Sequence, residues 1–198
     1  DRFSLVKNDE RHGILVILGS GDGIVGYGDA ASGLRVFLER ARIETRVVEA
    51  SDPGLVRREL GRRRYNAVVY FGHSVFGDDA SSTGWQCYNG EIFGCDNLDV
   101  LLHNPPDIVI SSSCHSARSV PFTRHSMAYH ALMAGVKSYI GTRWFLEIER
   151  STLFLSDLLK AMLLKGKTPR ESFGTALAAL EKQFGPDDSS LYNYVYYG

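Results

Sequence analysis

The sequence has few cysteines, no long apolar run and almost no net charge. Its 198 residues include three cysteines: Cys87, Cys95 and Cys114. An odd number of cysteines without closely spaced pairs argues against a disulfide scaffold and a zinc ribbon, and favours a reducing, cytoplasmic compartment. No apolar run reaches the roughly 18 residues that cross a membrane, and no secretory signal opens the chain. The formal net charge of −1 gives no indication that nucleic acid or an anionic membrane is a partner.

Internal repeats, low-complexity tracts and linkers are also absent from the sequence. A length of 198 residues favours one domain, and such a chain can bury a sizeable core without disulfides or metals. We therefore expect residues 1–198 to form a single domain. Because the sequence begins with Asp1-Arg2-Phe3 and not with methionine, we expect this domain to be a fragment of a longer chain.

One local run of positive charge stands out from the balanced composition. It consists of Arg57, Arg58, Arg62, Arg63 and Arg64. Most runs of this kind are a solvated helix face, and a smaller number bind an anionic partner.

Five short apolar runs rich in β-branched residues predict strands of a sheet that is covered on both faces. These runs are 14–18, 45–48, 67–71, 107–111 and 137–140. Patterns typical of helices occur at 31–42, 55–63, 98–103 and 124–134. Alternation of strands and helices favours an α/β fold with a mainly parallel sheet and helices on both faces.

The last third of the chain predicts two further helices and a sixth strand. Residues 150–165 form an amphipathic helical pattern. Its residues near one face are Leu153, Ser156, Leu159 and Leu163. Another helix starts at 168–171, and the aromatic tail 192–197 is rich in residues that favour strands.

Two residues suited to nucleophilic catalysis follow two of the predicted strands. His73 lies two residues after the strand 67–71, and Cys114 lies just after the strand 107–111. In an open α/β sheet, ligands bind in the crevice at the carboxyl ends of the strands. If these two strands are neighbours, both side chains point into the same crevice.

A cysteine nucleophile needs a base, because the thiolate is the reactive form and a free thiol is only a few per cent ionised at neutral pH. An imidazole can accept the proton and then protonate the leaving amine. The backbone amides of Ser74 and Cys114 could face the developing oxyanion.

Taken singly, a histidine at a strand end is more often structural and a buried cysteine is more often inert packing. Spacing alone therefore leaves both interpretations open.

The order of these motifs resembles that of the caspase-like cysteine peptidases, and most closely that of the CHAT domains. Four segments carry the resemblance: Tyr70-Phe71-Gly72-His73, Ser112-Ser113-Cys114, Met133 to Trp144, and Leu164 to Ser172. Each motif is loose, but together they keep the order and spacing of the family from about residue 14 to Gly198.

The resemblance implies a caspase-like three-layer sandwich with a His73–Cys114 dyad that cleaves a protein substrate through a thioester, without a cofactor. CHAT domains are often fused to TPR repeats or nucleotide-sensing modules, so control by a fused or bound sensor is also implied. Ser74 stands where the family often has a second glycine, and Ser113 where alanine is usual. Both residues are small and leave the backbone amides available.

In this superfamily the substrate pocket is built from loops beside the dyad, which implies a pocket formed here by Asp22, Ser112, Trp144 and Glu147. Related peptidases specific for arginine or lysine commonly have an acidic residue two positions before the nucleophile, where this chain has Ser112. A preference for cleavage after a basic residue therefore cannot be carried over from that feature. Alternatively, Trp144 caps the core and Glu147 starts the next helix, where acidic residues are favoured.

Two other interpretations remain open. The segment Gly21 to Gly26 matches the G-x-G-x-x-G dinucleotide fingerprint, although Glu49 lies 28 residues beyond Gly21, against roughly 20 for the acid that contacts the ribose. A caspase-like scaffold without activity would be an interaction domain. His115 stands beside Cys114 but has no second spaced ligand pair, so no metal site is expected.

Overall fold

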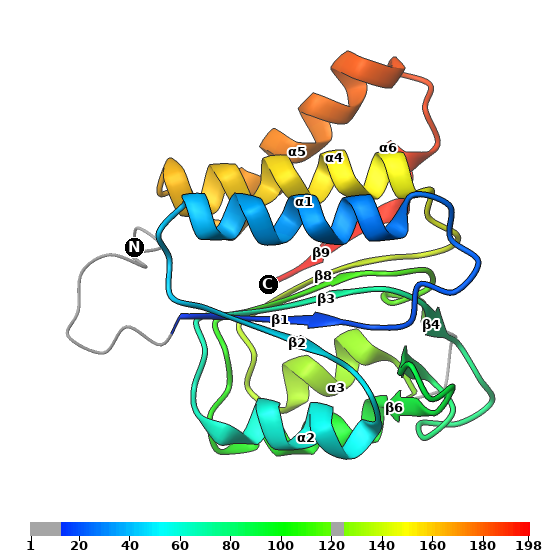
Figure 1. The fold of residues 1–198 in the computed structure, drawn as a ribbon. Helices are drawn as coiled ribbons and strands as arrows, with labels where there is room; N and C mark the ends of the chain where they lie inside the picture. The colour runs from blue at the N-terminus through cyan, green and yellow to red at the C-terminus, as the bar shows by residue number, and fades with distance from the viewer. Residues whose placement is uncertain (1–12, 120–124) are drawn as a thin grey trace.

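The computed structural model describes residues 13–119 and 125–198, and its centre is a six-stranded sheet in the order β2-β1-β3-β7-β8-β9 (Figure 1). The strands are β1 (Ile14–Leu18), β2 (Thr45–Glu49), β3 (Ala67–Phe71), β7 (Ile108–Ser112), β8 (Ser138–Thr142) and β9 (Tyr194–Tyr197). The first five pair in parallel, and β9 runs antiparallel to β8. The predicted mainly parallel, six-stranded sheet is therefore confirmed.

The central strands are apolar throughout because both of their faces are covered. In β1, β3, β7 and β8 every residue is buried. Alternate residues of β1 enter different cores: Ile14 and Val16 pack on one side of the sheet, and Leu15 and Ile17 on the other. A strand buried on both faces reads as a continuous apolar run, which is the pattern seen in the sequence.

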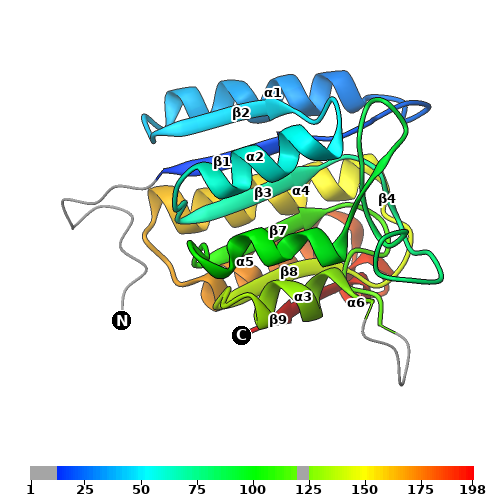
Figure 2. The ribbon, with the colours of Figure 1, turned by 90° about the horizontal axis from the view of Figure 1, so that it is seen from below.

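Helices form the two outer layers (Figure 1, Figure 2). One face is covered by α1 (Tyr27–Arg40), α4 (Ile148–Leu159) and α5 (Pro169–Phe184). The other is covered by α2 (Pro53–Arg62), the 3₁₀ helix η1 (Cys95–Leu102) and α3 (Met127–Met133). Helices occur at all the predicted positions, although Arg124, where one was expected to begin, lies outside the described residues. None of the helices described is both long and apolar enough to cross a membrane.

Helix α4 turns a different face to the sheet from the one predicted. It continues into a π-helical turn, η2 (Lys160–Leu164). Leu159 and Leu163 are buried as expected, but Leu153 and Ser156 are only half-buried. The buried residues of α4 are Ser151, Phe154, Leu155, Leu158 and Leu159. The ring of Phe154 stacks on Tyr194 of β9 with centroids 3.6 Å apart, a distant contact that helical periodicity does not reveal.

A small antiparallel sheet lies between β3 and β7 along the chain. It consists of β4 (Ser74–Val75), β5 (Gly84–Gln86) and β6 (Ile92–Gly94). Its anchor is Trp85, which is fully buried and stacks on Tyr70 of β3 with centroids 4.7 Å apart. The Trp85 indole N–H donates to Ser111 Oγ of β7 over 2.8 Å. The insert is thus fixed to the ends of the two strands that carry the candidate dyad.

Ion pairs occupy most of the arginine run. Its pairs are Arg57–Asp99 at 2.6 Å, Arg62–Glu59 at 3.8 Å, Arg63–Glu44 at 2.6 Å and Arg64–Asp107 at 3.4 Å. Exposed pairs of this kind each contribute little to stability. They nevertheless favour the interpretation of the run as a solvated helix face.

Gly19 follows β1 where the chain passes close to Tyr70. A Cβ at Gly19 would lie 2.0 Å from the Tyr70 hydroxyl oxygen, whereas a Cβ at Gly174 in α5 would meet nothing within 4 Å. We expect Gly19→Ala to lower the free energy of unfolding by about 1–3 kcal/mol, as overpacking does. The control Gly174→Ala should raise it by about 0.5–1 kcal/mol, because alanine is the better helix former. Urea unfolding measures both, and equal effects would contradict the argument.

Candidate active site

The carboxyl ends of β3 and β7 lie side by side. The two strands pair in parallel with Phe71 opposite Ser112. His73 follows β3 by two residues, and Cys114 follows β7 by two residues. Both line one cavity of about 100 Å³. The structure therefore brings together the two residues that the sequence singled out.

Cys114 lies in a turn that contacts the neighbouring strand. Its side chain is half-buried, and the amide N–H of Leu146 donates to its Sγ over 3.3 Å. Thr142, at the end of β8, donates its hydroxyl to the carbonyl of Ser113 over 2.6 Å. His115 has a φ of 55°, a left-handed conformation uncommon for residues with a side chain. The turn thus presents the sulfur to the cavity from a constrained backbone.

Backbone contacts hold His73 in place. Its N–H donates to the Ser20 carbonyl over 2.8 Å, and its carbonyl accepts from the Gln86 N–H over 3.0 Å and from the Tyr70 hydroxyl. Ring nitrogen Nε2 lies 2.9 Å from the carbonyl oxygen of Asp22. A carbonyl can only accept, so Nε2 carries the proton and Nδ1 is the unprotonated nitrogen of the neutral ring. The histidine therefore has one ring nitrogen free to act as a base.

Ser74 connects the two turns directly. Its hydroxyl donates to the carbonyl of Cys114. Ser74 also begins β4 and pairs with Trp85 of β5, so the small sheet holds it in position. The role predicted for the amides of Ser74 and Cys114 at an oxyanion stays a prediction.

The four residues predicted for the substrate pocket lie in different environments. Ser112 lines the cavity. Asp22 is exposed and contacts His73 through its backbone carbonyl, not through its carboxylate. Trp144 is 38% exposed, and Glu147 precedes α4 with its carboxylate paired to Arg150. Only Ser112 of these four is among the described residues that line the cavity, and the binding roles of all four stay predictions.

Asn193 is a buried residue that sequence reasoning missed. Its Oδ1 accepts from the N–H groups of Arg143 and Trp144, each over 3.0 Å, and its Nδ2 donates to the Phe145 carbonyl over 2.8 Å. The segment that it holds leads directly to Leu146, whose amide faces the nucleophile. Asn193 comes from the short helix α6 (Ser190–Asn193), and a polar residue inside the aromatic tail was the only sequence signal.

The glycine-rich segment after β1 is explained by local geometry. Gly23 and Gly26 adopt φ values of +77° and +82°, which favour glycine. A Cβ at Gly21 would lie 2.2 Å from the ring of Tyr27. Tyr27 in turn donates its hydroxyl to the carbonyls of Gly19 and Phe71. These glycines form the turn into α1, and the dinucleotide interpretation gains no support from them.

The other two cysteines are poor nucleophiles. Cys87 and Cys95 are fully buried, and burial raises the pKa of their thiols to about 11 and about 12, respectively. Thiols with such pKa values stay protonated near neutral pH, where the thiolate is the reactive form. Cys114 is the free cysteine whose side chain is only half-buried.

His115 participates in loop packing. Its Nδ1 lies 3.2 Å from the carbonyl of Arg143, and its ring packs edge-on against Phe145 with centroids 4.7 Å apart. Within residues 13–119 and 125–198, no group of three His, Cys, Asp or Glu side chains is placed to hold a metal ion.

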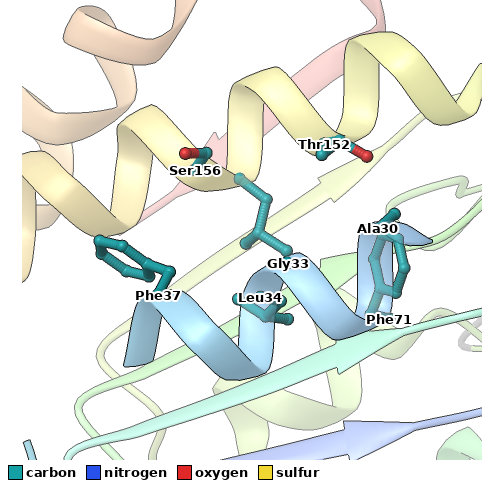
Figure 3. Close-up of a pocket in the computed structure, with 8 residues that line it drawn as sticks. Ala30, Gly33, Leu34, Phe37, Phe71, Thr152 and Ser156 are labelled. Carbon is teal, nitrogen blue, oxygen red and sulfur yellow. The ribbon is translucent and has the colours of Figure 1, made fainter. Parts of the chain in front are cut away.

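A larger hollow of about 200 Å³ lies between α1 and α4 (Figure 3). Phe37 of α1 and Thr152 of α4 line it, and Phe71 lines both this hollow and the smaller cavity. The described residues that line it include no cysteine, histidine or carboxylate. The cavity beside Cys114 is therefore the better candidate for catalysis.

Solved structures that share this fold include those of a cysteine proteinase and of separase. Gingipain R, an Arg-specific cysteine proteinase, matches with a TM-score of 0.67 and 12% identity over 93% of this chain and 46% of its own. Separase of Saccharomyces cerevisiae, in complex with securin, matches with a TM-score of 0.64 and 14% identity over 94% of this chain and 12% of its own. A complex of gingipain pro- and mature domains from Porphyromonas gingivalis gives a TM-score of 0.63 at 13% identity.

These matches define the fold as that of the caspase-like cysteine peptidases. The chain spans less than half of gingipain R and about an eighth of separase. Comparison with family models and with curated protein sequences gives no match. The CHAT branch suggested by the sequence motifs stays a prediction.

We expect Asn193→Ala to destabilise the segment beside Cys114. The substitution leaves the Trp144 N–H and the Phe145 carbonyl without their side-chain partner, and an unsatisfied buried group costs about 1–3 kcal/mol. Hydrogen exchange at Trp144 and Leu146 should accelerate more than exchange in the central strands. Asn89→Ala, in an exposed loop, should change stability by only about 0.5 kcal/mol or less. Unchanged exchange at Leu146 in the Asn193 variant would argue against this role.

Proposed function

We propose that this domain is a cysteine endopeptidase with Cys114 as nucleophile and His73 as base. The observation that carries the proposal is that both residues line one cavity at the ends of neighbouring parallel strands. The Asp22 carbonyl binds one ring nitrogen of His73 and leaves the other free to handle the proton. Gingipain R, a cysteine proteinase of the same fold, supports the assignment.

The reaction proceeds in two halves. The Cys114 sulfur attacks the scissile carbonyl carbon, a C–S bond forms, and the thiol proton is held by His73 Nδ1. His73 gives that proton to the leaving nitrogen as the C–N bond breaks, so an amine departs and a thioester remains. Water then attacks the thioester with His73 as base. The new acid leaves, and the proton returns to the sulfur.

The negative oxygen formed in each half needs hydrogen-bond donors that are already in place. The proposed donors are the backbone amides of Ser74 and Cys114. The bond from the Ser74 hydroxyl to the Cys114 carbonyl supports this proposal, because it keeps the two turns in a fixed relation. Preorganised donors of this kind each contribute about 10²- to 10³-fold to the rate.

We also propose a protein substrate and control by a fused or bound module, of the TPR-like or nucleotide-sensing type that the resemblance implies. Separase was solved with securin and gingipain with a pro-domain, so both of those peptidases bind another polypeptide. Phe145 packs against His115 beside Cys114 and is 78% exposed, so its ring is open to a partner.

Iodoacetamide should modify Cys114 selectively near neutral pH. Cys87 and Cys95 serve as internal controls, because burial and their raised pKa values keep them unreactive while the domain is folded. Peptide mass spectrometry after brief labelling identifies the modified residue. Cys114→Ala should abolish the fast labelling, and urea should expose the other two thiols. Modification of Cys87 or Cys95 while Cys114 stays free would overturn the proposal.

His73→Ala should slow alkylation of Cys114 by a peptide chloromethyl ketone by roughly 10²-fold or more, the low end of a general base's contribution. The matched control is His103→Ala, which removes an exposed histidine at the end of η1. A peptide library with cleavage sites read by mass spectrometry tests turnover. Fast, His73-dependent alkylation without any cleavage would favour the alternative of a catalytically silent interaction domain.

A further inference from the structure

The cavity beside Cys114 has a neutral lining. Apart from the dyad histidine, the described residues that line it carry no acidic or basic side chain. Tyr27, whose phenol is the one weak acid besides the nucleophile, stays neutral because burial raises its pKa. Glu147 and Glu149, which adjoin the lining residue Ile148 in the sequence, are not among the lining residues, and Glu147 pairs with Arg150.

The cavity lies within reach of the side chain next to the attacked bond. Cys114 lines it, and the carbonyl that Cys114 attacks is bonded to the Cα of the residue before the cleavage site, called P1. The first carbon of the P1 side chain is therefore two bonds from the reacting carbon. A cavity that contains the nucleophile is within its reach.

The size of the cavity limits that side chain. Its volume is about 100 Å³, and an apolar cavity of about 150 Å³ holds a benzene ring. Aromatic side chains are too large for it in this conformation. Side chains of the size of valine or threonine fit.

One residue that lines the cavity carries a hydroxyl without a hydrogen-bond partner. Ser113 Oγ lies 3.0 Å from Ser111 Oγ, and Ser151 Oγ donates to the Ile148 carbonyl over 2.9 Å. Ser112 Oγ is buried and has no partner among the described residues. A buried hydroxyl without a partner is unfavourable, and rotation of the Ser112 side chain towards the cavity would pair it with a polar ligand group.

From these observations we propose that the domain selects a small, uncharged P1 residue, and that Ser112 favours a polar side chain over an apolar one of equal shape. The inference rests on the proposed peptidase function and adds the substrate class. A charged P1 would lose its hydration in a cavity without a counter-charge, which is strongly unfavourable. The Arg-specific gingipain R shares the fold, so the selectivity proposed here differs from that of a close structural neighbour.

Matched chloromethyl ketone peptides test the proposal on the 198-residue chain. The probes are tetrapeptides that differ only in their last residue, which is threonine, valine, arginine, aspartate or phenylalanine. They occupy only the part of the site that binds residues before the cleaved bond. The Cys114 sulfur displaces chloride, a C–S bond forms and a C–Cl bond breaks. Alkylation rates are divided by the rate with iodoacetamide, which has no P1 side chain.

The wild-type chain should react fastest with the threonine probe. Its preference for threonine over valine should be about 3- to 10-fold, the equivalent of one net hydrogen bond. Ser112→Ala should reduce the ratio of the threonine rate to the valine rate to about one. Ser112→Asp should shift the preference to arginine, whereas Ser119→Asp, which adds the same charge at an exposed position outside the lining, should not.

Two outcomes overturn the inference alone. One is a wild-type preference for arginine, aspartate or phenylalanine, and the other is equal rates for threonine and valine, while Cys114 still reacts in a His73-dependent manner. If no peptide probe labels Cys114 faster than iodoacetamide does, the proposed peptidase function fails and the inference fails with it. Thermal unfolding of each variant shows that a lost preference does not reflect a lost fold.

Discussion

The parallel pairing of β3 with β7 is the constraint on which the rest of the site depends. Both strands are buried at every position, and Phe71 lies opposite Ser112. A shift of one residue would turn every side chain of a strand to the opposite core, so packing on both faces fixes the register. The register in turn decides where the chain leaves the sheet. The turns of His73 and Cys114 are neighbours because the core beneath them is packed in this way.

Around the two residues, the backbone does most of the positioning. The Asp22 carbonyl contacts the His73 ring, and the Leu146 amide donates to the sulfur of the nucleophile. Neither contact depends on the side chain of the residue that supplies it. The sequence can therefore vary at these positions while the geometry is kept, which is compatible with a shared fold at 12–14% identity. Neutral backbone groups also hold the dyad without adding fixed charge to the cavity.

Sequence reasoning succeeded where the signal is local. The strands 14–18 and 67–71 were predicted with the bounds that the structure gives, because a strand covered on both faces must be apolar throughout. His73 and Cys114 were found because each follows such a strand. Trp85 and Asn193 were missed because their partners are distant in the chain: Ser111 for the first, and residues 48 to 50 positions earlier for the second. No local pattern reports contacts of that range.

The reaction and its selectivity depend on different parts of the molecule. The dyad is fixed by the sheet, whereas the cavity walls come from segments outside it, such as the loop before α4 that contributes Leu146. Ser112 belongs to both parts, since it ends β7 and also lines the cavity. A change there alters the charge beside the scissile bond without moving the nucleophile, because the register is held by the buried residues before it. If the proposed role of Ser112 holds, a single strand-end position changes the substrate of this fold while its chemistry is kept.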